Sequence, residues 1–286
     1  CAWYDRQRCP SQVGALIDTT SGDYDYTYLS LGAGVQSSAL LVLACTDERV
    51  PTPDVAIFAD TGDEPASVYD YLEILTDWAK PFGVDVLTTQ KGVLSDACKK
   101  GFVPVPIYTA NPDGSTGILR RQCTREYKIA PITKKVRELL GYEPRYRVKE
   151  SVRAMLGISL DEIQRMKESR FKWVTNCFPL VDLGIKRSDC YKIITEVGLP
   201  NPTRSACVYC PYHSDSEWKQ MKDQSPREFE KAVQFDRMIR YQTKKGSGQL
   251  NYIHKSMTPL SEVVFNIDDP NQVDMFNSEC EGMCGL

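Results

Sequence analysis

The stretch Tyr26-Thr27-Tyr28-Leu29-Ser30-Leu31-Gly32-Ala33-Gly34-Val35-Gln36-Ser37-Ser38 decides which fold class the sequence predicts. Residues 26–31 predict a short strand, and residues 32–34 predict a tight turn. Residues 36–45 carry Leu and Ala in a helix-like run, so a helix follows the turn. The order is therefore strand, glycine turn, helix.

The same order continues downstream. Residues 55–59 predict a second strand that stops at Asp60-Thr61-Gly62, residues 65–79 a helix, and residues 84–88 a third strand. Because strands alternate with helices, we expect an α/β fold with a doubly wound parallel sheet. Ligands on such sheets bind beyond the carboxyl ends of the strands, where residues 32–38 and 60–62 both fall.

Three parts of the chain are expected from pattern and composition. Residues 1–25 are polar and lack periodicity, which predicts an N-terminal arm. Residues 26–213 form the expected main domain. Residues 214–286 predict a mainly helical C-terminal extension with a cysteine-bearing tail. Within it, residues 217–240 predict one continuous helix.

Composition narrows the class of protein. The 286 residues include 35 basic and 38 acidic ones, so the net charge of −3 argues against a nucleic-acid binder with a uniformly positive surface. No apolar run approaches the roughly 18 residues of a membrane span, and the first residues lack an apolar signal region. We therefore expect a cytoplasmic globular protein without a membrane partner. Its 11 cysteines favour metal binding or thiol chemistry over structural disulfides.

Positive charge is concentrated in residues 119–153, which hold eleven basic and four acidic residues. A solvated helix face at residues 132–140 explains part of this charge, but not the excess. A chain that is acidic elsewhere and basic here is expected to neutralise a polyanion, such as a nucleotide or a nucleic-acid backbone.

The glycine turn at residues 32–34 predicts an anion site. Small residues let backbone N–H groups turn toward a ligand, and the helix that follows adds its positive dipole. The loop is neither a Walker A motif nor the dinucleotide Gly-x-Gly-x-x-Gly. A tight turn without a ligand is the alternative. Asp60 and Thr61 at the next strand end favour the ligand, because their side chains can bind a ribose, a metal ion or the glycine loop.

These motifs resemble those of the adenine nucleotide alpha hydrolases (PP-loop superfamily) of the phosphoadenylyl-sulfate (PAPS) reductase type. That family includes sulfonucleotide reductases and ATP-dependent sulfurtransferases. Residues 30–37 resemble its loop Ser-x-Ser-Gly-Gly-x-Asp-Ser, and residues 60–62 match its Asp-Thr-Gly. Residues 122–131 are similar to Cys-Cys-x-x-x-Lys-x-x-Pro with one extra residue, and residues 157–165 to Gly-x-Arg-x-x-Glu-Ser-x-x-Arg. The resemblance spans residue 28 to about residue 213.

The resemblance implies a Rossmann-like fold that binds ATP or a related adenine nucleotide, with Mg²⁺ as a further expected ligand. It assigns nucleotide binding to Ser30, Gly32, Ala33, Gly34, Gln36, Ser37, Asp60 and Thr61. The sequence also departs from the family pattern. Gln36 stands where pyrophosphatase members have Asp, Gln122 replaces the first Cys of the pair, and Ser159 and Ile163 replace Arg and Ser. The change at Gln36 argues against metal-assisted release of pyrophosphate.

Cys207-Val208-Tyr209-Cys210-Pro211 predicts a metal centre, because two thiolates separated by two residues can bind one metal. A redox dithiol and two buried core cysteines are the alternatives. By resemblance, Cys123 is the third ligand, and Cys190 is expected as the fourth, with Cys177 as the alternative. A 4Fe-4S cluster is the expected cofactor, with zinc as the alternative.

The C-terminus holds two further candidate thiols. Cys284-Gly285-Leu286 resembles the reductase tail Glu-Cys-Gly-Ile/Leu-His without its His, and Cys280 follows Glu279 as a second match. The resemblance implies a catalytic role for Cys284, with Cys280 in reserve. Spare cysteines on a frayed end, or an oxidisable pair, are the alternative.

The sequence features are compatible with three functions. The first is an ATP-dependent sulfurtransferase that adenylates a nucleobase or nucleic acid and inserts sulfur with an iron–sulfur cluster. It needs a sulfur donor or thiol reductant as a partner. The second is a sulfonucleotide reductase that releases sulfite through Cys284. The third is a zinc-stabilised nucleic-acid-binding module without catalysis, which leaves Asp60-Thr61-Gly62 unexplained.

Overall fold

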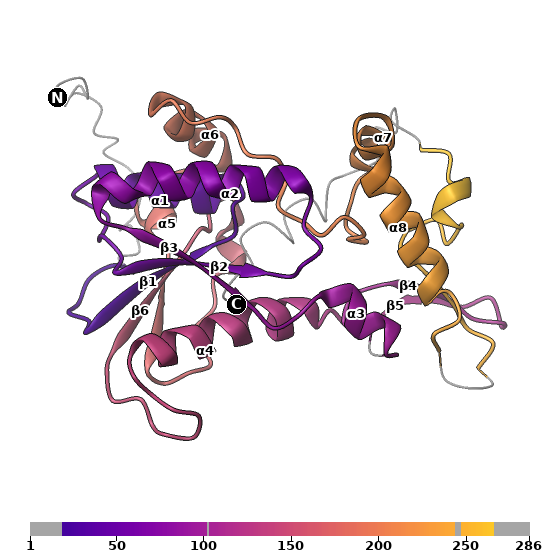
Figure 1. Cartoon of the computed structure of the whole chain (residues 1–286), viewed down its shortest axis with the longest axis horizontal. Coiled ribbons are helices and arrows are strands. Elements are labelled where there is room, and N and C mark those ends of the chain that lie inside the picture. Colours follow the sequence, from indigo (N-terminus) through magenta and orange to yellow (C-terminus); the bar gives the residue numbers. More distant parts are fainter. Residues whose placement is uncertain (1–18, 102, 244–246, 266–286) are drawn as a thin grey trace.

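The computed structural model describes residues 19–101, 103–243 and 247–265. Its main sheet consists of β1 (Tyr26–Leu31), β2 (Val55–Asp60), β3 (Asp85–Gln90), β6 (Val152–Leu156) and β7 (Val174–Cys177). The strand order is β3-β2-β1-β6-β7 and every neighbouring pair is parallel (Figure 1). The expected α/β fold with a doubly wound parallel sheet is confirmed. The chain moves outward from β1 in both directions, which places a topological switch point at the end of β1.

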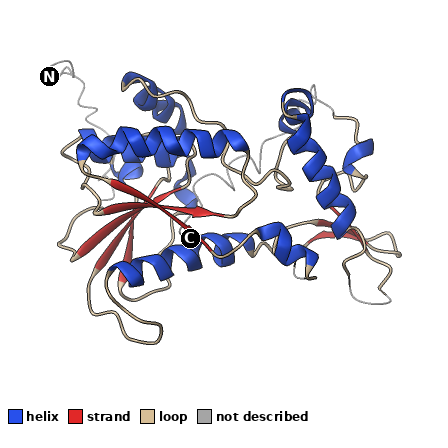
Figure 2. Ribbon diagram, viewed as in Figure 1, coloured by secondary structure: helices blue, strands red, loops and turns tan. Residues whose placement is uncertain are grey.

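Helices cover both faces of this sheet (Figure 2). One face carries α1 (Val35–Thr46), α2 (Ala66–Ala79) and α6 (Arg187–Glu196), and the other carries α4 (Ala130–Leu139). Side chains alternate along each strand, so Leu29 and Leu31 pack under α1 whereas Tyr28 packs toward α4. Two hydrophobic layers result, one on each face.

A second lobe lies beside the sheet, at the right of Figure 1. It contains α7 (Asp215–Gln224), α8 (Pro226–Ile239) and an antiparallel sheet of order β5-β4-β8. These strands are β4 (Tyr108–Ala110), β5 (Thr116–Ile118) and β8 (Leu250–Tyr252). The expected helical C-terminal extension is present among the described residues. Its core also takes in α3 (Leu94–Lys99), which belongs to the expected main domain. The domain boundary at residue 213 stays a prediction.

Short elements complete the described chain. A π-helical turn, η2 (Thr124–Ile129), runs directly into α4. The other short elements are η1 (Lys80–Phe82), η3 (Leu160–Arg165), α5 (Pro179–Asp182) and η4 (Leu260–Glu262).

Two local expectations were wrong. Residues 217–240 are not one helix, because Ser225 leaves the helical region (φ −133°, ψ 59°) before Pro226, which begins α8. Proline disfavours helical backbone at the preceding residue, so the helix is interrupted there. The sequence also predicts that Ser188-Asp189 caps the helix that follows, but the N-cap of α6 is Lys186. The backbone N–H of Lys186 donates to Asp189 over 3.2 Å and closes a capping box.

The expected N-terminal arm lies mostly outside the described residues. The part that is described, residues 19–25, lies against the main sheet. Thr19 donates to Asp182 over 2.7 Å, and Asp25 accepts a 2.7 Å hydrogen bond from the Ser151 backbone N–H. No helix in residues 19–265, their two gaps aside, is long and apolar enough to cross a membrane.

Candidate functional site

The glycine loop follows β1 directly and leads into α1. Ala33 has a φ of +54°, a left-handed conformation that costs an alanine about 1 kcal/mol. The Gly32 N–H donates to Ser37 Oγ over 3.1 Å, and Ser37 Oγ donates to the Gly34 carbonyl over 3.2 Å. No side chain caps α1 at Gly34. The first turn of this 12-residue helix is therefore left to bind an anion through its N–H groups.

A second loop packs tightly against this turn. Gly157 follows β6, the neighbour of β1. A Cβ atom at Gly157 would lie 2.7 Å from the Ser37 nitrogen and 2.8 Å from the Ser37 Cα. Only glycine allows this approach of two backbones. The two strand ends therefore fix each other in position at the switch point.

A buried polar network stands beside the loop. Gln36 is 1% exposed, and its Nε2 donates to Ser159 Oγ over 2.9 Å and to Glu162 Oε2 over 2.7 Å. Arg165 donates to the same Glu162 oxygen over 2.5 Å. Arg187, the first residue of α6, donates to Gln36 Oε1 over 3.0 Å. Gln36 therefore bridges a carboxylate and a guanidinium through hydrogen bonds.

The network combines buried acidic and basic side chains. Glu162 is 4% exposed, and its burial raises the pKa of the carboxyl, an effect that Arg165 opposes. The Oε1 atom of Glu162 is buried and has no hydrogen-bond partner among the described residues. Asp161 also belongs to this group, because its charge raises the pKa of Glu162 and its Oδ1 accepts a 3.1 Å hydrogen bond from the Arg187 N–H. The network therefore sets two guanidinium groups against two carboxylates.

The next strand end is organised by Asp60. Its Oδ1 accepts hydrogen bonds from the Gly62 N–H over 2.7 Å and from Tyr69 Oη over 2.8 Å. Gln90 Nε2 donates to Oδ2 over 3.3 Å. The structure therefore shows Asp60 shaping the loop after β2.

Thr61 connects this loop to a thiol. Its Oγ1 lies 3.2 Å from Cys207 Sγ and donates to Glu64 Oε1 over 3.2 Å. The Glu64 carboxylate is buried, and Lys128 Nζ approaches its Oε1 to 3.7 Å. The expected nucleotide residue Thr61 and the expected metal ligand Cys207 are thus in contact at one end of the sheet.

The structure separates the expected metal ligands. Cys123 and Cys207 pack against the same hydrophobic cluster, and the Cys210 N–H donates to the Cys207 carbonyl over 2.9 Å. Cys190 instead lies in the cluster between α6 and α1, and its burial raises its pKa to about 12. The alternative, Cys177, is buried at the end of β7.

Cys98 was not expected at the site. It is a buried member of the Cys123 and Cys207 cluster, and its pKa is raised to about 12 by burial and then by Asp63 and Cys123. Among the described residues, no group of three or more His, Cys, Asp or Glu side chains is arranged to hold a metal ion. The metal centre and its ligands stay a prediction.

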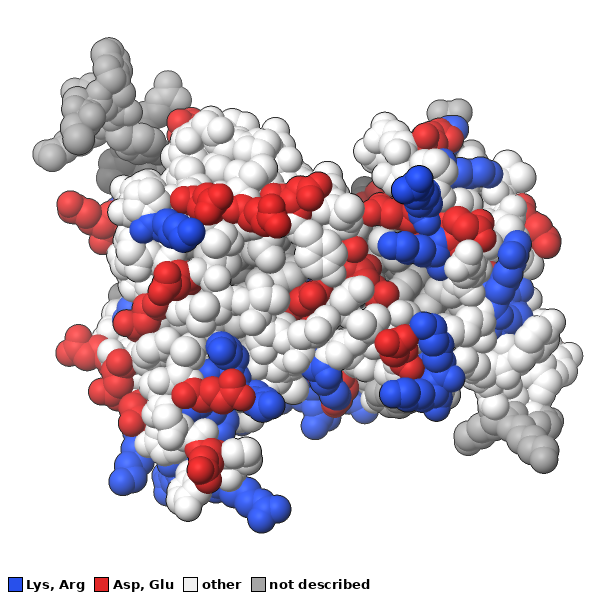
Figure 3. All heavy atoms as spheres, viewed as in Figure 1, with Lys and Arg blue, Asp and Glu red and all other residues white. Residues whose placement is uncertain are grey.

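The sequence also predicted a role for the C-terminal thiols and for the basic segment 119–153. Cys280 and Cys284 lie outside the described residues. The basic segment 119–153 forms η2, α4 and the loop that leads to β6. Figure 3 shows Lys and Arg gathered along the lower edge of the molecule, in the region of α4 and this loop, and mainly acidic side chains along α2.

Sequence reasoning missed several site residues. Glu162 lies in the segment quoted for the family resemblance, so a signal for it existed. Glu64 follows Asp-Thr-Gly by two residues and was also within reach. Cys98 and Arg187 stand in no motif, and only the fold brings them to their partners. Lys128 matches the Lys of the family motif, but its pairing with Glu64 is not visible in the sequence.

Comparisons with known proteins found only distant structural similarity. No family model and no curated protein matches this chain. One similar solved structure is a PAPS reductase from Candida auris in complex with phosphate. Its identity is 13% and its TM-score 0.39, over 63% of this chain and 76% of that chain. Another is the U34-tRNA thiolase NcsA from Methanococcus maripaludis with its 4Fe-4S cluster. Its identity is 12% and its TM-score 0.36, over 80% of this chain and 75% of that chain.

Proposed function

We propose that this chain is an enzyme that binds ATP, or a related adenine nucleotide, at the switch point of its main sheet and uses it for sulfur transfer. The observation that carries the nucleotide site is the Gln36 network beside an uncapped helix N-terminus. Uncapped N–H groups lie beside this network, where an open α/β sheet binds its ligands. The choice of adenine rests on the family resemblance of residues 30–37 and 60–62.

The contact between Thr61 and Cys207 supports sulfur chemistry at the same edge. A thiol 3.2 Å from the loop after β2 lies one strand away from the glycine loop. Glu64 Oε1 is 3.9 Å from the Cys207 sulfur, close to a group that can accept its proton. Nucleotide and thiol would therefore work at neighbouring strand ends.

The reaction that fits this site has two substitutions. A carbonyl oxygen of the substrate attacks the α-phosphorus of ATP, and pyrophosphate leaves. A hydrosulfide ion from an external donor then forms a bond to the activated carbon, and AMP leaves with the former carbonyl oxygen. The proton left on the substrate sulfur passes to a base.

Calorimetry tests the nucleotide site. We expect ATP to bind the wild-type chain and to lose most of its affinity in Gly32→Val, since a branched side chain obstructs the N–H groups of the loop. Gly117→Val, the same change in an exposed strand of the second lobe, is the matched control. Equal ATP affinity in Gly32→Val and wild type refutes the site. Sulfite release from a sulfonucleotide, without use of ATP, would favour the reductase instead.

A further inference from the structure

A groove follows the open edge of the main sheet at β7, which pairs with β6 on one side only. It consists of a cavity of about 640 Å³ between Thr19 and Lys172 and a second of about 520 Å³ between Arg147 and Thr175. Lys172 and Thr175 line both cavities. A smaller third cavity shares Lys167 and Asn176 with the first and is also lined by Arg170. We call the three together the β7 groove.

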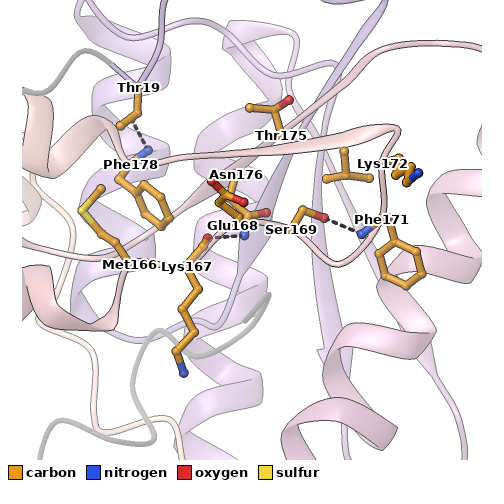
Figure 4. Close-up of a pocket in the computed structure, with 11 residues that line it drawn as sticks. Thr19, Met166, Lys167, Glu168, Ser169, Phe171, Lys172, Thr175, Asn176 and Phe178 are labelled. Atoms are coloured by element: carbon orange, nitrogen blue, oxygen red, sulfur yellow. Dashed lines mark hydrogen bonds between the residues drawn. The ribbon is translucent and has the colours of Figure 1, made fainter.

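Hydrogen bonds hold the walls of the β7 groove in place. Asn176 Nδ2 donates to the Lys167 carbonyl over 2.9 Å, and the Phe171 N–H donates to Ser169 Oγ over 3.1 Å. At the far end the Phe178 N–H donates to Thr19 Oγ1 over 2.7 Å. Figure 4 shows all three bonds around the cavity. The groove is therefore preformed, which lowers the entropic cost of binding a ligand.

Positive side chains line the groove without acidic partners. The set is Arg147, Lys149, Lys167, Arg170 and Lys172. All five are exposed, and none forms an ion pair with a residue of the described chain. The acidic lining residues are Glu150, which accepts from the Lys149 N–H over 3.2 Å, and Glu168. The groove thus has a net positive charge and attracts a polyanion.

Two aromatic rings stand among these cations. Phe171 is 38% exposed, and its ring centroid is 5.9 Å from that of Trp173. Exposed rings between basic side chains are the arrangement that binds single-stranded nucleic acid, because bases stack on the rings while phosphates pair with the cations. A duplex keeps its bases stacked inside and offers nothing to these rings.

The β7 groove leads toward the nucleotide site. Met166, which lines the groove, directly follows Arg165 of the buried network. Phe178 lines the groove and also packs with Leu156 and Ile158 at the end of β6. One hydrophobic cluster therefore separates the groove from the switch point.

We propose that the β7 groove binds a single-stranded nucleic acid and presents it to the switch point as the substrate. This proposal adds the substrate class to the proposed function. The reaction of the bound strand rests on the proposed function, whereas its binding in the groove does not. Binding is measured without adenine nucleotide, so failure of the groove and failure of the nucleotide site give separate results.

Fluorescence anisotropy with labelled oligonucleotides of about 15 nucleotides tests the proposal. The probes are oligouridine, oligothymidine and a self-paired RNA duplex. The groove variant combines Lys167→Ala, Arg170→Ala and Lys172→Ala. Its control combines Arg227→Ala, Lys231→Ala and Arg237→Ala, three exposed residues of α8.

We expect the groove variant to bind a single strand at least tenfold more weakly than wild type. The slope of log affinity against log salt should be shallower by about 2, since each lost phosphate contact contributes roughly 0.7. The control should retain wild-type affinity. Phe171→Ala should lose about tenfold in affinity for the single strand without a change in salt slope. The two single-strand probes show whether the groove prefers the ribose or the deoxyribose polymer.

Three results would overturn the proposal. One is wild-type affinity in the groove variant. The second is an equal loss in the control, which would show general electrostatic attraction. The third is tighter binding of the duplex than of either single strand.

Discussion

Gly157 sets the geometry of the site through the absence of a side chain. Its backbone lies so close to Ser37 that a Cβ atom would fall 2.7 Å from the Ser37 nitrogen. Ser37 Oγ in turn accepts from the Gly32 N–H. A side chain added at Gly157 would therefore displace Ser37, and the glycine loop would move with Ser37.

Gly157→Ala tests this coupling. We expect it to lower the free energy of unfolding by about 1–3 kcal/mol, because neither backbone can yield without moving a buried strand end. ATP affinity should fall with it. Urea unfolding and calorimetry measure the two effects. Gly117→Ala, whose added Cβ would meet only Thr109 Oγ1 at 3.2 Å, is the control. Wild-type stability in Gly157→Ala would contradict the close packing.

The short helix η3 contributes Glu162, an ionisable side chain, to the Gln36 network. Burial raises the pKa of Glu162 above its ordinary value of 4.5. At pH values between the ordinary and the raised pKa of Glu162, the folded protein therefore binds more protons than the unfolded chain. The contribution of Glu162 to stability is lost as pH rises through the raised pKa.

Glu162→Gln should remove this pH dependence. We expect the slope of unfolding free energy against pH, between about pH 4 and pH 7, to become more positive in the variant than in wild type. Urea unfolding at a series of pH values measures the slope. Glu73→Gln, at an exposed position of α2, is the control. An unchanged slope in Glu162→Gln would mean that this carboxyl does not titrate as its burial requires.

Helix α6 fixes the position of Cys190 in the hydrophobic core. It packs Cys190 into the cluster under α1, away from Cys207. We expect Cys190→Ser to keep the metal content of the wild-type chain and to lose about 1–3 kcal/mol of stability, because a buried hydroxyl replaces a thiol. Cys207→Ser should lower the metal content of anaerobically purified protein without that loss.

Iron and zinc analysis, with the absorption spectrum, gives the readout. Loss of metal from a folded Cys190→Ser protein would restore the ligand set expected from the sequence. A wild-type chain that binds neither metal would contradict the metal centre altogether.

The whole molecule shows which features a sequence can predict. Strands β1, β2 and β3 were predicted because their apolar runs and the Gly and Asp residues that end them are local signals. The small sheet was not predicted, since β4 and β8 pair across more than half of the described chain and are three residues each. Short strands leave no periodicity to detect.

Some residues of the candidate site were likewise visible in the sequence, and others were not. The glycine loop and Asp60 stand in contiguous motifs and were found from the sequence. The Gln36 network draws on Glu162 and Arg187, which lie far along the chain. The choice of Cys190 as the fourth ligand stays a prediction, and the sequence offered little guidance for it. Spacing alone does not say which face of the sheet a cysteine packs against, and Cys190 lies under α1.

Hydrogen–deuterium exchange with and without ATP tests the central claim most directly, because it locates the bound nucleotide on the chain. The account predicts that saturating ATP slows amide exchange at residues 32–38 and 157–162, where uncapped N–H groups and the buried network meet. Exchange in α7 and α8 should not change. Saturated ATP binding with no protection at residues 32–38, or with protection confined to the second lobe, would contradict it.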